Sequence, residues 1–275
     1  MKATRGLSCI NSSNRQVNFK NNINKLGDIL GLSFALARAE FKLRNEGSYL
    51  GVFWYLLNPL LVIGLLFFVF SDRLGNDIPY YLMYLFLGVT MFNFFQSVTL
   101  ESAKAIIEDH RGLVKSINFP RESLIISVIL KNFFAHIFEI VLFALLLLFL
   151  KSSVLSIVYY LAVLPFFLLF VFGVSLLLSV ITVYFVDVKN IWAFASRLLW
   201  LGTPIFYAIG GQTKLFYLNL FNPMYYFITF SREAVIYSRF PDTMVWAGMI
   251  FYAVVFFSVG LLIFSMLKVK IAEKI

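Results

Sequence analysis

Polar residues recur at helical spacing inside one of the most apolar stretches of the sequence, residues 123–150. Asn132, His136 and Glu139 stand at i, i+4 and i+7, which places them on one face of a helix. Lys131 directly precedes them. Ionisable groups inside a bilayer are costly, so they usually face a partner or a cavity. The His–Glu pair could serve proton-coupled transport or hydrogen bonding between helices. We favour hydrogen bonding, because one such pair without further acids makes a poor proton relay.

The composition indicates that these residues are positioned by membrane helices. Hydrophobic residues make up 61% of the 275 residues and charged residues 13%, with a mean hydropathy of +0.86. Soluble domains are about 45–50% apolar and about 25% charged. A bilayer core of about 30 Å requires about 20 apolar residues in a helix. We therefore expect an all-α membrane protein with spans near residues 52–70, 80–100, 123–150, 154–185, 190–209 and 244–267.

The distribution of positive charge predicts the orientation. With six spans, the side that holds both termini carries most of the 23 Lys and Arg residues, and such residues favour the cytoplasmic side. Both termini of this multi-pass chain should therefore be cytoplasmic. The net charge of +9 is explained by this bias and by contact with anionic membrane lipids, so no nucleic acid is expected as a partner. The single cysteine, Cys9, excludes an intrachain disulfide, and no metal-ligand spacing exists.

The segment before the first span has the pattern of an amphipathic helix. Residues 1–27 form a polar cytoplasmic tail, residues 28–46 the helix, and residues 47–275 the transmembrane domain. The helix carries an apolar stripe at helical spacing, made of Ile29, Leu32, Leu36, Ala39 and Leu43. We expect it to lie at the cytoplasmic membrane surface, resting on the membrane or packing on another part of the protein.

Two further segments are longer or more apolar than a simple connection. Residues 101–121 show a helical pattern and exceed the length that a loop needs, which suggests a cytoplasmic partner or else a solvated helical hairpin. Residues 210–243 contain two short apolar runs divided at Asn222-Pro223. These runs predict re-entrant helices at the outer side, serving as a gate or as a structural cap. The candidate gate residues are Asn222, Pro223, Tyr225 and Tyr226.

Six short motifs follow one another along the chain. A basic segment precedes Gly-Val-Phe-Trp-Tyr-Leu-Leu-Asn-Pro at residues 51–59, and the other motifs lie at residues 87–95, 113–121, 187–189, 204–207 and 222–232. In their order and spacing they resemble the ABC-2 type permeases that export polysaccharides. The Asn-rich tail has no counterpart in that family pattern.

The resemblance implies the transmembrane subunit of an ATP-driven exporter in the bacterial plasma (inner) membrane. The implied substrate is a lipid-linked glycan such as O-antigen, capsule or teichoic acid. Such permeases look like homodimers with a separate nucleotide-binding ATPase subunit. This chain contains no Gly-x-x-x-x-Gly-Lys-[Ser/Thr] phosphate loop, so it is not expected to be an enzyme and no catalytic residue is assigned. ATP and Mg would be bound by the partner, and no cofactor or metal by this chain.

The resemblance also implies roles for particular residues. Docking on the ATPase would involve Arg38, Lys42, Glu108, His110, Leu113, Val114, Lys115, Phe119 and Arg121. The substrate would pass between two protomers along the first and fifth spans. A sugar polymer presents C–H patches and hydroxyls, which aromatic faces and a few polar groups could guide. The candidates for this path are Trp54, Tyr55, Asn58, Phe92, Phe95, Trp200, Phe206 and Tyr207; alternatively, each packs against lipid or a neighbouring helix.

Two other functions are possible from the sequence. One is an ABC-2 exporter of a drug or a small lipid. The other is a membrane-embedded acyl- or glycosyltransferase, in which clustered His or Asp residues would be expected at the bilayer surface. The two histidines, His110 and His136, lie on different elements, so the enzyme hypothesis ranks below both transport hypotheses.

Overall fold

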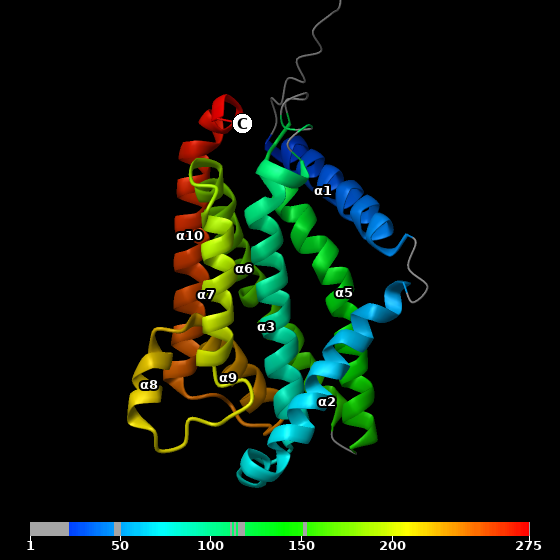
Figure 1. The fold of residues 1–275 in the computed structure, drawn as a ribbon, viewed down its shortest axis with the longest axis vertical. Helices are drawn as coiled ribbons and strands as arrows, with labels where there is room; N and C mark the ends of the chain where they lie inside the picture. Colours follow the sequence, from blue (N-terminus) through cyan, green and yellow to red (C-terminus); the bar gives the residue numbers. More distant parts are fainter. Residues whose placement is uncertain are drawn as a thin grey trace, which may run out of the picture.

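The computed structural model describes residues 22–46, 51–110, 119–150 and 153–274, together with residues 112 and 114. Throughout these ranges the regular structure is helical (Figure 1). Five helices are long and apolar enough to cross a membrane: α2 (Trp54–Leu74), α3 (Tyr81–Lys104), α5 (Glu122–Phe149), α6 (Ile157–Tyr184) and α10 (Thr243–Lys274). The predicted all-α, multi-pass membrane protein is confirmed at this level.

Helix α3 forms the centre of the bundle. In the apolar part of α3, 78% of the residues are buried, compared with 17% in that of α2 and 22% in that of α5. It packs against α2, α5, α6 and the short α7, and it continues as a π-helical turn over Ala105–Asp109. In Figure 1 α3 stands between α7 on one side and α2 with α5 on the other. Side chains on α3 can therefore contact most of the other helices.

Helix α1 (Asn22–Asn45) packs against α5 at the end of the bundle where the described part of α10 also ends (Figure 1). Its inner face centres on Ser33 and Ala37, both fully buried, because small side chains allow two helices to approach closely. Ala39 and Leu43 of the predicted apolar stripe are exposed instead. The rings of Phe34 and Phe41 contact Phe134 of α5, at centroid distances of 6.0 and 5.9 Å. The inner face is thus rotated from the predicted stripe.

Helices α6 and α10 form the closest helix pair. Gly173 of α6 and Gly260 of α10 face each other, and a Cβ atom at either position would collide with the backbone of the other helix. Such glycine contacts let membrane helices pack backbone to backbone, where dispersion attraction rather than the hydrophobic effect holds them together. The pair packs on the far side of α3 from α2.

The fifth expected span, residues 190–209, is helical only in its first part. Helix α7 (Val188–Gly202) has 15 residues, which gives a length of about 22 Å, less than a bilayer core. The helix ends before Pro204 because proline cannot donate the next helical hydrogen bond. The chain then runs without regular structure to α8 (Thr213–Leu220) and α9 (Pro223–Val235) at the opposite end of the bundle from α1 (Figure 1).

Candidate functional site

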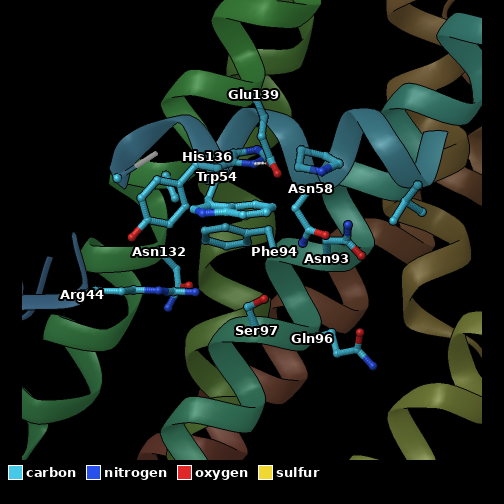
Figure 2. A pocket seen from close by; sticks show the side chains of 15 residues that line it. Arg44, Trp54, Asn58, Asn93, Phe94, Gln96, Ser97, Asn132, His136 and Glu139 are labelled. Carbon is cyan, nitrogen blue, oxygen red and sulfur yellow. Dashed lines mark hydrogen bonds and ion pairs between the residues drawn. The ribbon is translucent and has the colours of Figure 1, made fainter. Parts of the chain in front are cut away.

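A polar cavity of about 520 Å³ lies between α2, α3 and α5, near the point where α1 ends (Figure 2). We call it the polar groove. Trp54, Tyr55 and Asn58 of α2 line one wall of it. Helix α3 contributes Asn93, Gln96 and Ser97, helix α5 contributes Asn132, His136 and Glu139, and Arg44 of α1 lies at one end. The volume falls in the range of pockets that hold small molecules.

The helical repeat explains why polar groups gather there. Asn93, Gln96 and Ser97 are three and four residues apart, so they share one face of α3, just as the polar residues of α5 share theirs. Figure 2 shows the side chains of Asn58 and Asn93 close together at the groove. Gly51 begins the turn into α2 at φ +45°, a conformation that residues with a Cβ atom rarely adopt.

His136 joins Glu139 to Tyr160 at the deep side of the groove. Nδ1 of His136 is 2.6 Å from Oε2 of Glu139, and Nε2 is 2.6 Å from the Tyr160 hydroxyl of α6. The cavity behind this triad measures about 10 Å³, room for one water at most, and its other lining residues are mainly apolar. The geometry supports hydrogen bonding between helices, because no further acid continues the chain on that side among the residues that line the cavity.

A cluster of charges ties α1 to α3 and α5; we call it the interface cluster. Nζ of Lys131 lies 2.7 Å from Oε2 of Glu40 and 3.0 Å from Oε2 of Glu101. Arg44 is 3.3 Å from Oε1 of Glu101, and Nε2 of His110 is 3.0 Å from Oε1 of Glu40. These residues come from three helices and the turn after α3, so no local sequence pattern predicts the cluster.

Glu40 stays ionised within this cluster. Burial by itself would raise the pKa of its carboxyl group, but hydrogen bonds from His110 and Lys131, and their charges, lower the pKa below the ordinary 4.5. The cluster borders the polar groove directly, because Asn132 in the groove donates a 2.8 Å hydrogen bond to Oε2 of Glu101.

The residues expected to dock on an ATPase are spread over several environments. Arg38 and Lys42 are exposed on α1, whereas Val114 is buried and Phe119 half-buried. Glu108 pairs with Lys189 at the start of α7, and Arg121 donates to the backbone oxygen of Lys268 on α10. His110 belongs to the interface cluster. Leu113 and Lys115 lie outside the described residues.

The residues expected along the path fall into three groups. Trp54, Tyr55 and Asn58 line the polar groove. Phe92 and Phe95 are buried in the core, where the two rings pack edge to face, and Phe95 also stacks on Phe170 of α6. The structure does not bring these two to the groove. The third group lies at the end of α7 and consists of Trp200, Phe206 and Tyr207, with Phe206 stacked on Phe70.

The side chain of Asn222 connects three segments of the outer region: the chain just after α7, helix α8 and helix α9. Its side chain caps α9 by accepting a hydrogen bond from the backbone nitrogen of Met224, and Pro223 takes the first helical position. Its Nδ2 donates to Oγ1 of Thr203 at 2.8 Å and to Oδ1 of Asn219 at 3.2 Å.

The two tyrosines named with Asn222 as gate candidates lie in the first turn of α9. Tyr226 is buried and donates to the backbone oxygen of Leu220, whereas Tyr225 is half-buried.

Arg232 of α9 was not among the expected site residues. Its side chain donates hydrogen bonds to the non-helical backbone that follows α7. Its buried guanidinium donates to the backbone oxygens of Tyr84, Pro204 and Ile205 at 2.6–3.2 Å and lies 3.3 Å from the centre of the Tyr84 ring. Non-helical backbone at membrane depth must find such partners. The sequence signals for this residue were its charge in the apolar run after Pro223 and its place at the end of the motif at residues 222–232.

The fold and the groove define a multi-pass membrane protein that holds a polar site among apolar helices. No group of three His, Cys, Asp or Glu residues that could hold a metal ion occurs in the described part of the chain. Residues 32–236 match the ABC-2 type transporter family. The chain belongs to this family, so it is a transport subunit rather than an enzyme.

Two similar proteins have names that are more specific than the family description. The chain is 26% identical to the O-antigen export system permease protein RfbA of Myxococcus xanthus over 258 residues, which cover 92% of this chain and 98% of that protein. It is 26% identical to a protein of the same name from Klebsiella pneumoniae over 253 residues, 90% of this chain and 96% of the relative. The similarity thus extends over nearly the whole length of both relatives.

Proposed function

We propose that this chain is the membrane-spanning subunit of an ATP-driven exporter of lipid-linked polysaccharide. The observation that carries the proposal is the similarity to O-antigen export permeases over about nine tenths of the chain, beyond the family match alone. The polar groove supports it, because a hydrophilic polymer can cross apolar helices only along groups that replace its hydration.

The proposal includes a second copy of this chain and a separate ATPase subunit in the inner membrane complex. Arg38 and Lys42, exposed on α1, and the segment that contains Lys115 form the docking surface. A movement of α1 is then transmitted to α3 and α5 through the interface cluster. The reason is that Lys131 of α5 forms ion pairs with both Glu40 of α1 and Glu101 of α3. ATP and Mg are bound by the partner subunit.

A deletion strain tests the substrate. Loss of surface glycan, accumulation of lipid-linked glycan inside the cell, and restoration of both by the plasmid-borne gene are expected. Intact surface glycan together with altered accumulation of a drug or small lipid would point instead to the other kind of ABC-2 exporter.

Purification tests the partner. The complex, solubilised in mild detergent, should contain an ATPase and two copies of this chain. Lys115→Glu should leave insertion intact and uncouple ATP hydrolysis from export. Arg121 suits this test less well, because it also holds α10 through Lys268, so its reversal would disturb packing. Recovery of a single subunit that still transports without an ATPase would exclude the proposed assembly.

The proposed topology counts α7 as a sixth crossing, because α7 runs along the bundle from the end near α1 toward α8 and α9 (Figure 1), and it places both termini in the cytoplasm, with α8 and α9 outside. Cys9 is the only cysteine, so an impermeant maleimide should label it only after cells are opened. In a Cys9→Ser background, Tyr217→Cys on the exposed face of α8 should react in intact cells. The reverse pattern would refute the orientation.

A further inference from the structure

The chemistry of the polar groove identifies the part of a substrate that it can hold. We infer that the groove between α2, α3 and α5 binds a neutral, hydroxyl-rich sugar unit. The inference rests on the proposed function and deepens it by assigning a sugar-binding site within one protomer.

The groove offers unpaired amides. The side chains of Asn58 and Asn93 make no hydrogen bond to another described residue, and both line the cavity (Figure 2). An amide supplies two donors and an acceptor, which suits hydroxyl groups that both donate and accept. The Tyr55 hydroxyl is buried and also lacks a partner in the described part of the chain. This buried hydroxyl is costly unless a ligand satisfies it, and the exposed Asn58 and half-buried Asn93 side chains are accessible to the same ligand.

A carboxylate oxygen is available at the deep end. Oε2 of Glu139 is held by His136, and His136 is fixed by Tyr160, so the carboxylate has a set orientation. Oε1 of Glu139 has no partner among the described residues. A hydrogen bond from a sugar hydroxyl to this charged oxygen would be stronger than one to a neutral acceptor. Figure 2 shows Glu139 and His136 together on the groove.

An aromatic face completes the site. The Trp54 side chain is 48% exposed although it stands on a membrane helix, and it lines the groove next to Asn58. The face of an indole ring carries partial negative charge, which attracts the weakly positive C–H groups of a sugar ring. An apolar surface combined with a few oriented polar groups is the usual composition of a small-molecule site.

The charges of the lining argue against an anionic ligand. Among the described residues, Arg44 is the one cation that lines the groove, and it is already paired with Glu101 at 3.3 Å. The deep end holds the Glu139 carboxylate, which would repel a phosphate. The sugar, rather than the phosphate of a lipid-linked glycan, therefore fits between Trp54 and Glu139.

Binding of short glycolipids to the full-length protein in phosphatidylcholine nanodiscs tests the site. The probes are geranyl glycosides of glucose, galactose, mannose, rhamnose and N-acetylglucosamine, compared with geraniol and geranyl phosphate. Affinity is measured by microscale thermophoresis, with partitioning into empty nanodiscs subtracted. At least one glycoside should bind saturably and about tenfold more tightly than geraniol, which corresponds to about 1.4 kcal/mol. Geranyl phosphate should bind no better than geraniol.

Matched variants place the binding in the groove. Trp54→Leu should weaken glycoside binding at least several-fold, whereas Trp246→Leu on α10, 43% exposed, should leave it unchanged. Glu139→Gln should weaken it about tenfold or more, because a hydrogen bond to a charged group is replaced by a neutral one. Asn58→Leu should also weaken it, and this variant removes no side-chain hydrogen bond to another residue in the described part of the chain.

Three results would overturn the inference: glycosides that bind no better than geraniol, tighter binding of geranyl phosphate than of every glycoside, or unchanged binding in both Trp54→Leu and Asn58→Leu. The surface-glycan phenotype of the deletion strain is measured separately. Glycoside binding in the groove with normal surface glycan would refute the proposed exporter and keep the sugar site, whereas a glycan defect without glycoside binding would do the opposite.

Discussion

Lys131 of α5 donates a 2.7 Å hydrogen bond to Oε2 of Glu40 on α1. The same ammonium lies 3.0 Å from Glu101 of α3, so a single charge holds two carboxylates from two other helices. All three side chains are largely enclosed, and Lys131 is only 13% exposed. The contact is the electrostatic link between the amphipathic helix and the wall of the polar groove.

Removal of Lys131 should therefore loosen α1. Lys131→Met leaves Glu40 and Glu101 facing each other without their shared cation, and removing one partner of a buried ion pair costs about 3 kcal/mol or more. We expect a clear fall in the thermal unfolding midpoint in detergent. Lys42→Met is the matched control, because Lys42 is 81% exposed and its pair with Glu46 is 3.9 Å long. Equal midpoints for the two variants would contradict the role of the cluster.

Acid should weaken the same contact. The pKa of Glu40 is lower in the folded protein than its ordinary 4.5, so its contribution to stability is complete above that value and is lost as the pH falls through the folded pKa. The groups that face it are Lys131, His110 and, across the shared ammonium, Glu101.

We expect the contribution of Glu40 to the unfolding midpoint to be constant above about pH 5 and to decrease as the pH falls below about 4.5. Glu40→Gln should be less stable than the wild type at pH 7 and should show a smaller further loss on acidification. Parallel pH profiles for the two proteins would show that Glu40 does not titrate in this way.

Arg232 should be essential for the outer region. Arg232→Lys cannot reach all three carbonyl groups with one ammonium, and each buried carbonyl left without a partner costs about 1–3 kcal/mol. We expect a lower thermal midpoint and reduced export.

Gly88→Ala gives an independent test of the same contact, because a Cβ at Gly88 would collide with Nη2 of Arg232. Gly64→Ala on α2 is the control, since nothing lies within 4 Å of the added atom. A destabilised Gly64→Ala and an unaffected Gly88→Ala would refute this account.

Asn222 combines a cap with a bridge, and two substitutions separate them. Asn222→Asp keeps the oxygen that accepts from Met224 but loses the donors to Thr203 and Asn219. Asn222→Ala loses both functions, and loss of the cap alone costs about 1 kcal/mol. If the region is a gate, Asn222→Asp should keep most of the stability but slow export or leak ions. A structural cap predicts instead that export follows stability in both variants.

The class of the protein follows from its amino-acid sequence alone. Apolar runs of about 20 residues leave the chain few alternatives, because backbone groups in lipid must be satisfied within a helix. The helix bounds of α2, α3, α5, α6 and α10 agree with the expected spans to within a few residues at most ends. The shared face of His136 and Glu139 also followed from spacing alone, because the helical repeat is a local property.

Which polar groups meet depends on how the helices pack in three dimensions. Glu40, Glu101 and Lys131 are far apart in the sequence, and the crossing of α1 over α5 brings them together. Likewise, Phe92 and Trp54 are both aromatic residues of membrane helices, yet one is buried in the core and the other lines a groove. The direction in which a membrane helix turns its faces depends on packing against its neighbours, because lipid and protein interior are equally apolar.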